Sequence, residues 1–391
     1  MRPIYPAHLR QGRFTVVLAL TLFATAFPLN GNAAERGDLA PSTSAYVFVG
    51  SYTGTYPNLV DYINAFAVAP DGTVQTISGS PFNLPSFGLV AAGGHVFGDD
   101  TQNIASYSVQ PGGSLQEVSV VYGLAYIPYP GDQTVDALNP DRSSRTLTSV
   151  ESCGSCNSEI TTWSISPDGQ LSYSVGTLPA NGPAKWDGIL TFSIDDTYAY
   201  LSAPAAGAFE IMQRNSNGTL QWENSPFPSR PPLSNRQEEV CILDKIVPSQ
   251  SGYVSLAWYG GGPGCSAGYI LGNYTVGTNG ALNLVPGSGF TPQVLENSMA
   301  YDASGSYLAL AGNGMQILKL QSNGKFAAVT AAVPSPDGSF QQVLWDNAGH
   351  VYGLTQSGLD IYNFDGQHLT LAPGSPYAIS NVTGMALVPA S

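Results

Sequence analysis

Short apolar runs broken by glycine-containing turns fill most of the chain. In residues 298–326 three such runs, 299–301, 307–311 and 315–320, are separated by Asp-Ala-Ser-Gly and Gly-Asn-Gly and followed by Ser-Asn-Gly. Runs of this length are too short for helices and are typical of strands in a meander. An Asn-Gly pair also supplies the positive φ that a tight hairpin needs. This stretch therefore predicts consecutive antiparallel strands.

The same unit, a strand followed by a glycine turn, recurs seven times, at Gly72, Gly113, Gly169, Gly218, Gly280, Gly324 and Gly366. The intervals are 41, 56, 49, 62, 44 and 42 residues, a spacing typical of four-stranded propeller blades. A second strand precedes each unit, and outer-strand segments follow several of them, at 79–82, 225–227, 287–290 and 374–377. We therefore predict an all-β fold, a seven-bladed β-propeller of four-stranded antiparallel blades. An open sandwich is the alternative.

The two ends of the repeat predict how the ring closes. Residues 383–389 (TGMALVP) match an innermost strand, whereas residues 46–52 match the second strand of a blade. We expect the C-terminal inner strand to pair with the N-terminal strands, which leaves no long free edge. The propeller is predicted over residues 45–391, after a flexible lead-in at 35–44.

Residues 1–34 have the pattern of a secretory signal peptide. Arg2, Arg10 and Arg13 precede an apolar run over residues 14–27, and small residues follow at 31, 33 and 34. The apolar run is short for a membrane span, so a retained anchor is the weaker alternative. We predict a secreted or periplasmic protein with no stable membrane span after cleavage.

The chain is acidic, with 27 Asp and Glu against 13 Lys and Arg, a net charge of −14. Cleavage after residue 34 would remove three arginines and no acidic residue, which changes the charge to −17. Nucleic acid is not expected as a partner, because binding phosphates needs a basic face. No cofactor is predicted, although the acidity leaves calcium binding open.

Strand alternation sorts the loops onto two faces. With strands A to D counted from the axis outward, A–B and C–D turns lie on one face and B–C and D–A loops on the other. The first, the tight-turn face, has only short turns, and aspartates such as Asp71 and Asp302 are expected to stabilise those turns. The second, the long-loop face, carries the long insertions at 53–61, 121–133, 152–158, 225–240 and 260–268. Function concentrates in such loops, so we place the site on this face and at the channel mouth.

Aromatic, charged and amide side chains on the long-loop face are the predicted ligand-binding residues: Tyr52, Asp132, Trp186, Arg236, Trp258, Tyr259 and Gln342. A polar ring is expected near the starts of the inner strands, formed by Asp132, Asp187, Glu239, Glu296 and Gln342. Aromatic rings beside carboxylates and amides suit a sugar or a small polar metabolite. A solvated channel mouth without a ligand is the alternative.

Histidine chemistry is not expected at that site. His95 (GGHVFG) and His350 (AGHVYG) hold equivalent positions at the start of B strands, which indicates a structural role on the tight-turn face. His368 lies in a C–D hairpin on the same face. A His-Asp-Ser triad and a histidine metal site are therefore improbable.

The four cysteines predict disulfides in an exported chain. Cys241 and Cys265 are both expected at the long-loop end of one blade and are predicted to pair; Cys153 and Cys156 (CGSC) would pair locally. Redox catalysis by the CxxC pair is the alternative, but the strand-to-helix setting that lowers a thiol pKa is missing. A four-cysteine zinc site is a further, weaker alternative.

The repeat, together with Phe48-Val-Gly-Ser-Tyr-Thr53, resembles the seven-bladed lactonase-type propellers, the 6-phosphogluconolactonase group and the neighbouring YVTN-type surface or periplasmic propellers. The resemblance covers most of residues 46–389. Lactonases of this type carry Gly-Pro-Arg-His before an inner strand; here Gly182-Pro183 is followed by Ala184 and Lys185. Glu296 and Asp302 keep the family's six-residue Glu–Asp spacing, but two blades later. The resemblance implies a lactonase fold without the phosphate contact and acid–base group of that pair.

Two classes of function follow. The first is an exported, non-catalytic propeller that binds a carbohydrate, a small polar metabolite or a protein and is expected to be a monomer. The second is a lactonase-like hydrolase with an altered site, for which Asp187, Glu239, Glu296 and Lys185 are the catalytic candidates; a structural envelope role is a third. Binding predicts an aromatic-walled groove, whereas hydrolysis predicts an enclosed pocket with a carboxylate of raised pKa.

Overall fold

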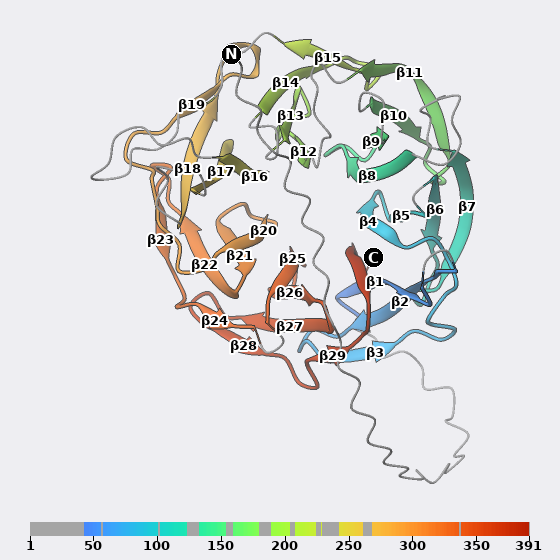
Figure 1. The fold of residues 1–391 in the computed structure, drawn as a ribbon. Coiled ribbons are helices and arrows are strands. Elements are labelled where there is room, and N and C mark those ends of the chain that lie inside the picture. The colour runs from blue at the N-terminus through green and yellow to red at the C-terminus, as the bar shows by residue number, and fades with distance from the viewer. Residues whose placement is uncertain are drawn as a thin grey trace, which may run out of the picture. The chain divides into compact units, whose positions relative to one another are not determined.

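Seven antiparallel sheets form a ring around a central axis, which confirms the predicted seven-bladed propeller (Figure 1). The computed structural model describes residues 43–390 except 56–57, 101, 123–132, 154–158, 180–188, 204–207, 224–227, 229–241, 261–267 and 336–337. Blade 1 contains β1 to β3 and β30, and blades 2 to 7 follow in chain order. Within the described residues no helix is long and apolar enough to cross a membrane.

Each blade contributes one strand to each of four concentric layers. The inner strands are β4 (Phe87–Ala92), β8 (Gln133–Pro140), β12 (Ile189–Phe192), β16 (Ile242–Pro248), β20 (Glu296–Tyr301), β25 (Phe340–Trp345) and β30 (Val382–Pro389). The second strands are β1 (Ala45–Thr53), β5 (His95–Asp99), β9 (Thr146–Cys153), β13 (Tyr198–Ala203), β17 (Tyr253–Gly260), β21 (Tyr307–Gly312) and β26 (His350–Thr355). The third strands are β2 (Val60–Val68), β6 (Asn103–Val109), β10 (Glu159–Ile165), β14 (Ala208–Arg214), β18 (Gly268–Val276), β22 (Gly314–Leu320) and β27 (Gly358–Phe364).

The outer layer is the most variable. Its strands are β3 (Val74–Thr76), β7 (Leu115–Tyr122), β11 (Leu171–Pro179), β15 (Leu220–Glu223), β19 (Leu282–Leu284), β23 (Phe326–Ala328) with β24 (Val333–Pro334), and β28 (Leu369–Leu371) with β29 (Tyr377–Ala378); a 3-10 turn, η2, spans Thr278–Gly280. Three of the predicted outer segments are confirmed, because Phe82 pairs with Ile63, Phe290 with Leu271, and β29 with β27. Residues 225–227 lie outside the described residues.

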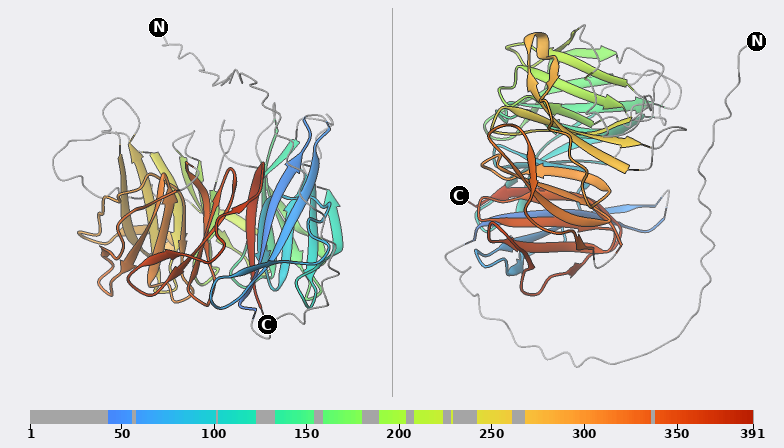
Figure 2. Two further views of the ribbon diagram at one scale, coloured as in Figure 1. Left: turned by 90° about the horizontal axis from the view of Figure 1, so that it is seen from below. Right: turned by 90° about the vertical axis from the view of Figure 1, so that its left-hand side faces the viewer.

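The C-terminal strand closes the ring as predicted. β30 pairs antiparallel with β1, with Ala45 opposite Pro389 and Gly50 opposite Gly384, so blade 1 combines both ends of the propeller chain. Figure 2 (left) shows the end of β30 at the lower rim of the ring, which is the tight-turn face. Because both ends of the propeller chain contribute strands to blade 1, the ring is closed by the hydrogen bonds between β1 and β30.

Hydrophobic residues fill the seven interfaces between neighbouring blades. Each buried cluster combines side chains of two adjacent blades; the cluster around Leu271, Leu308 and Leu310, for example, joins blades 5 and 6. The other six clusters occupy the remaining interfaces in the same way. Side chains along a strand point alternately to its two faces, so each blade presents one row of apolar side chains to the preceding blade and another to the following blade. The strands are therefore buried on both faces.

The C–D turn glycines dock each blade onto the preceding one. Gly169 (φ +88°) lies against the ring of His95, so that a β-carbon at position 169 would overlap that ring. Equivalent contacts to the preceding blade are made by Gly72, Gly113, Gly218, Gly280 and Gly324. Gly366 (φ +95°) is the exception, because the place of its β-carbon is open. The repeated glycine therefore serves both the turn and the seam between blades.

The histidines have the structural role that the sequence predicts. His95 Nε2 lies 3.3 Å from the carbonyl oxygen of Pro167, and His350 Nε2 lies 3.2 Å from that of Pro70. Both prolines belong to the C–D turn of the next blade, so each histidine ties two blades together on the tight-turn face. His368 lies in an exposed pair with Asp365.

Aspartates of the tight turns accept hydrogen bonds from their own turns, as predicted. Asp71 accepts from the amide and hydroxyl of Thr73, and Asp302 accepts from the amide of Tyr307 at 2.8 Å. Asp346 also accepts from the Tyr352 hydroxyl at 2.8 Å and lies 2.5 Å from His350 Nδ1. Burial opposes ionisation of both groups, but their mutual hydrogen bond and charges prevail, so the pKa of Asp346 is lowered and that of His350 is raised.

Replacing Gly169 by alanine should destabilise the propeller more than the same change at Gly366. Both substitutions strain a left-handed residue, but only the first drives a methyl group into the preceding blade. We expect an additional loss of roughly 1–3 kcal/mol at position 169 in denaturant unfolding. Equal losses in the two variants would show that the glycine serves the turn alone.

His350→Gln should destabilise the protein in a pH-dependent way. Because the pKa of His350 is raised in the folded protein, the stability that its pair with Asp346 contributes is present at acidic pH and is lost as the pH rises through the folded-state pKa of His350. The pKa of Asp346 is lowered, so Asp346 becomes protonated, and the pair's contribution to stability is lost, only at strongly acidic pH. The loss, on the order of 1–3 kcal/mol, should thus be larger at pH 6 than at pH 9. His368→Gln, in an exposed pair, is the control and should change stability little at either pH.

Candidate functional site

A β-bulge interrupts the inner strand near its start in blades 1, 2, 3, 5, 6 and 7; the described part of the inner strand of blade 4, β12, has none. The register with the second strand shifts by one residue at this point, between Leu243 and Lys245 in β16 and between Glu296 and Ser298 in β20, for example. The extra residues in blades 1, 3, 5, 6 and 7 are polar: Thr383, Asp136, Asp244, Asn297 and Gln341; in blade 2 the extra residue lies within Gly88–Leu89. Bulges re-aim side chains, so the fold presents a repeated polar position at the long-loop end of the channel.

The residue just before the bulge is apolar in five of the six blades in which the structure describes a bulge. It is Val382, Phe87, Val135, Leu243 and Phe340 in blades 1, 2, 3, 5 and 7; in blade 4 the matching position lies outside the described residues. In blade 6 it is Glu296, whose side chain is fully buried. Leu243 and Phe340 each pack into the interface with the preceding blade. Glu296 therefore places a carboxyl group where the repeat requires a core side chain.

Neither carboxyl oxygen of Glu296 has a hydrogen-bond partner among the residues that the structure describes. Burial raises the pKa of Glu296 to about 9; the charge of Asp244 adds to this rise, while its own backbone amide and Lys245 act against it. At neutral pH the group is consequently protonated and can both donate and accept a hydrogen bond. A buried polar group without partners costs stability, so its presence favours a role in function.

Lys245 lies on β16 of blade 5, across the interface from Glu296, and its charge lowers the pKa of Glu296. Its bulge equivalents, Ser298 and Gln342, both bond the inner strand of the next blade. The same geometry directs Lys245 from blade 5 toward blade 6, where it interacts electrostatically with Glu296. Its ammonium group lies 2.8 Å from Asp244, the adjacent bulged residue, and both side chains are about 20% exposed. The ion pair is thus partly accessible beside a fully buried carboxyl group.

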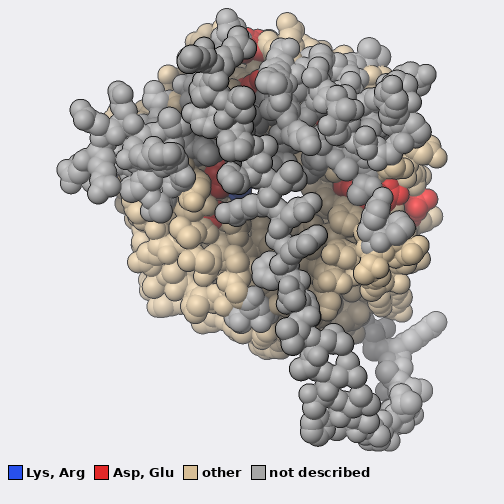
Figure 3. All heavy atoms as spheres, in the orientation of Figure 1, with Lys and Arg blue, Asp and Glu red and all other residues tan. Residues whose placement is uncertain are grey.

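Two tyrosines border this cluster. The rings of Tyr259 and Tyr269 are 5.0 Å apart, and Tyr259 is 37% exposed. Burial, followed by the nearby Asp244, Glu296 and Tyr259, raises the pKa of Tyr269, which therefore stays a neutral hydroxyl. In the space-filling view acidic and basic atoms lie side by side near the centre of the ring (Figure 3). We call Asp244, Lys245, Tyr259, Tyr269 and Glu296 the blade 5/6 cluster.

Of the predicted ligand-binding residues that the structure describes, which are Tyr52, Trp258, Tyr259 and Gln342, only Tyr259 belongs to this cluster. Trp258 is buried in the core and donates its indole N–H to Tyr274. Gln342 binds the backbone of Met385, donating to its carbonyl oxygen at 2.9 Å and accepting from its amide at 2.7 Å. Tyr52 stacks on Phe87 at 6.1 Å, between blades 1 and 2. Trp258 and Gln342 therefore have packing and clamping roles.

The remaining predicted site residues lie outside the described residues: Asp132, Lys185, Trp186, Asp187, Arg236, Glu239, Cys156, Cys241 and Cys265. Cys153 ends β9, but its side chain is not described. The predicted disulfides and most of the predicted ring thus stay predictions.

Sequence reasoning identified Glu296 but overlooked Asp244 and Lys245. The signal was present, because polar pairs interrupt apolar inner strands at one place, as in ILDKIVP, ENSMAY and FQQVLW. Reading those pairs as a bulge requires the strand register, which periodicity alone does not supply. Among the described residues, no group of three or more His, Cys, Asp or Glu is arranged to hold a metal ion.

The fold is shared with lactonase-type propellers of known structure. A putative 6-phosphogluconolactonase from Bacteroides fragilis matches with a TM-score of 0.65 at 12% identity, over 89% of this chain and 98% of the other. The periplasmic gluconolactonase PpgL of Pseudomonas aeruginosa matches with a TM-score of 0.64 at 15% identity, over 88% and 99%. The chain has the fold of the lactonase propellers.

That likeness establishes the architecture and leaves the activity open. A hypothetical selenium-binding protein from Sulfolobus tokodaii matches nearly as well, with a TM-score of 0.60 at 10% identity over 89% of this chain and 94% of the other. No protein-family model and no curated protein matches the sequence. The function must therefore be argued from the site.

Glu296→Leu should stabilise the protein, because it restores the apolar side chain that five other blades carry at this position. We expect a gain of about 1–3 kcal/mol in the free energy of unfolding. The pKa of Glu296 is near 4.5 unfolded and about 9 folded, so the native protein loses stability as pH rises between these values and the variant does not. The gain should therefore be larger at pH 8 than at pH 5.

Denaturant unfolding of both proteins at the two pH values measures this effect. Glu210→Leu, at a half-buried carboxylate on β14, is the control and should change stability by less than about 0.5 kcal/mol. A loss of stability in Glu296→Leu would mean that the carboxyl group has a structural partner.

Proposed function

We propose that the protein binds a small polyhydroxylated molecule, a sugar or a sugar lactone, at the blade 5/6 cluster on the long-loop face. The observation that carries this proposal is the buried carboxyl group of Glu296, which has no hydrogen-bond partner within the described residues and stands at a position that is apolar in five other blades. A ligand that supplied the missing hydrogen bonds would offset the cost of burying it. Ligand binding would then explain why a carboxyl group is buried at position 296.

The chemistry of the cluster suits hydroxyl groups. Protonated Glu296 donates one hydrogen bond and accepts others, Asp244 accepts, and Lys245 donates. Vicinal hydroxyls of a sugar both donate and accept, so they match this mixed set. The paired rings of Tyr259 and Tyr269 add a flat apolar surface of the kind on which sugar C–H groups pack.

Export is part of this proposal. The predicted signal peptide supports a secreted or periplasmic location, and the Pseudomonas aeruginosa neighbour is described as periplasmic. An acidic chain of net charge −14 is poorly suited to anionic substrates such as sugar phosphates, and the cluster has a single cation, Lys245. A neutral sugar or lactone therefore fits better than a phosphorylated one.

Hydrolysis of a lactone is the second candidate, favoured by the raised pKa of Glu296. A carboxyl group that is neutral at pH 7 can act as a general acid. Water would add to the lactone carbonyl, the ring C–O bond would break, and Glu296 would protonate the departing oxygen and regain its proton from the water. The other catalytic candidates, Lys185, Asp187 and Glu239, lie outside the described residues.

Calorimetric titration of neutral sugars and glucono-δ-lactone tests the proposal. We expect binding to the native protein and at least tenfold weaker binding to Glu296→Gln, which keeps the size of the side chain but removes the acidic proton. Glu210→Gln, at a carboxylate whose pKa is also raised by burial, is the matched control and should bind as the native protein does.

Two results would change the conclusion. Equal affinity of Glu296→Gln and the native protein for every compound would remove the cluster as the binding site. Lactone turnover that is lost in Glu296→Gln would make hydrolysis the function. A parallel titration of released acid on the same lactone distinguishes the two readings.

A further inference from the structure

Lysine and arginine are missing from two long stretches of the chain. None occurs between residues 37 and 141 or between residues 326 and 391, and these stretches build blades 7, 1 and 2, which are neighbours in the ring. Blades 1 and 2 contain Asp61, Asp99, Asp100 and Glu117. In Figure 3 acidic atoms at the right-hand rim lie over blade 2 with no basic atoms beside them. We call blades 7, 1 and 2 the acidic sector, which attracts positively charged partners.

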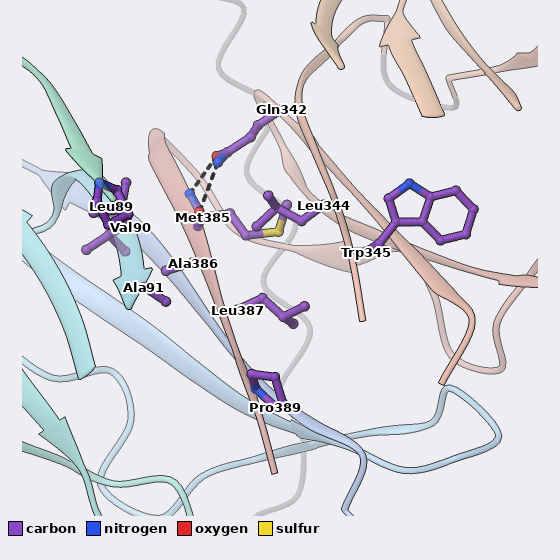
Figure 4. A pocket seen from close by; sticks show the side chains of 11 residues that line it. Leu89, Val90, Ala91, Gln342, Leu344, Trp345, Met385, Ala386, Leu387 and Pro389 are labelled. Carbon is purple, nitrogen blue, oxygen red and sulfur yellow. Dashed lines mark hydrogen bonds between the residues drawn. The ribbon is translucent and has the colours of Figure 1, made fainter. Parts of the chain in front are cut away.

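The channel side of the acidic sector is apolar. Its inner strands, β25, β30 and β4, line a cavity of about 320 Å³ together with Pro140 of blade 3 (Figure 4). No lining residue carries a charge, and the side-chain amide of Gln342 is bonded to the backbone of Met385. A cation in this cavity would lose hydration without meeting a carboxylate. A cationic partner is therefore expected on the outer side of the sector.

The outer strand of blade 2, β7, differs from the outer layers of blades 1 and 7. In blade 1 the outer layer consists of the three-residue strand β3 and an isolated bridge, and in blade 7 of the short strands β28 and β29. β7 spans eight residues and, within the described residues, pairs only with β6. Its outer edge therefore has backbone groups to which an extended chain can bond.

A bulge in β7 places Glu117, Val120 and Tyr122 on one face of the strand. Glu117 pairs with Tyr107 and Val120 with Ala105, and both of these partners pack against blade 1. The face consequently points toward blade 1, where β3 is too short to cover it. All three side chains are exposed, Val120 by 45% and Tyr122 by 77%. One acidic and two apolar side chains thus lie together on this face.

Two buried acceptor atoms lie in the same seam between blades 1 and 2. Asp61 Oδ1 and Asn103 Oδ1 have no hydrogen-bond partner among the described residues. Strand alternation turns Asp61 to the same side as Ile63, which packs on blade 2, and Asn103 pairs with Tyr122. Burial, followed by the charge of Asp100, raises the pKa of Asp61. Acceptors without donors beside a second carboxylate favour a positively charged N–H donor.

We propose that the β7 rim, formed by Asp61, Asn103, Glu117, Val120 and Tyr122, docks an extended basic segment of a partner protein. A lysine or arginine of that segment donates to Asp61 and Asn103, and its apolar residues pack on Val120 and Tyr122. A second copy of this chain is a poorer partner, because each copy has a net charge of −14. The inference is independent of the proposed function, since it involves blades 1 and 2 and not the blade 5/6 cluster.

Fluorescence anisotropy with labelled peptides as long as β7 tests this inference. A peptide of alternating lysine and valine should bind, and its affinity should fall about tenfold when glutamate replaces lysine or when serine replaces valine. Added salt should weaken binding, because exposed charges take part in it. Equal affinity of the lysine–valine and lysine–serine peptides, full competition by spermine, or no binding of the lysine–valine peptide would overturn the proposal.

Variants locate the peptide on the β7 rim. Asp61→Asn, Glu117→Gln and Tyr122→Ser should each weaken the lysine–valine peptide by roughly threefold to tenfold. Two controls in blade 7 of the same sector, Asp365→Asn at an exposed carboxylate and Leu371→Ser at an exposed leucine, should leave its affinity unchanged. Equal weakening by Asp365→Asn and Glu117→Gln would mean that net charge alone binds the peptide, which would remove the rim as the site.

Two further measurements complete the test. Thermal unfolding verifies that each variant is folded, and Glu117→Gln and Tyr122→Ser change exposed side chains, so they decide the question even if Asp61→Asn does not fold. Sedimentation of the protein without peptide should show a monomer. A dimer that Tyr122→Ser dissociates would assign the β7 rim to a second copy and overturn the proposal.

Discussion

The seam between neighbouring blades is the constraint on which the rest of the structure depends. A blade of four strands cannot bury its own apolar faces, so each one is stable only when it packs on two neighbours. The hydrophobic clusters lie in these seams, and the C–D turn glycines allow the backbone of one blade to approach the side chains of the preceding one. Pairing of β30 with β1 gives blade 1 two complete seams as well. The ring therefore behaves as one cooperative unit rather than as seven modules.

The dependence on contacts between blades also limits which residues are free to take part in function. The strands and tight turns are occupied by seam contacts, as the histidines at Pro70 and Pro167 illustrate. A functional side chain must then come from a loop or from a point where the strand leaves its regular register. The inner-strand bulge is such a point, because it adds a residue without breaking the seam. Asp244 and Lys245 result from one bulge, and Glu296 stands immediately before another.

At Glu296 the apolar side chain that the repeat favours has been replaced by the carboxyl group of the proposed site. In five other blades the equivalent position carries an apolar side chain, whereas blade 6 buries a carboxyl group that has no hydrogen-bond partner in the described part of the chain. Such a conflict between local chemistry and global packing is expected at functional sites, where stability is given up for reactivity or recognition. The cavity lined by β4, β8, β25 and β30 presents the opposite case, since the polar side-chain atoms of Gln342 and Trp345 in its lining bond to the backbone.

The sequence by itself determined the fold, the ring closure, the two faces and the structural place of His95 and His350. These features follow from short-range chemistry repeated seven times, namely period-two alternation and glycine turns, which need no knowledge of distant contacts. It also singled out Glu296, Tyr259 and Gln342, but it could not distinguish a side chain that binds the backbone of a neighbouring strand, as Gln342 does, from one that belongs to a candidate ligand site. Only the tertiary structure decided that Gln342 holds Met385, that Trp258 lies in the core, and that the charge of Lys245 acts on Glu296. Those facts depend on strand register and on which blade a side chain faces, and a shift of one residue at a bulge reverses that direction.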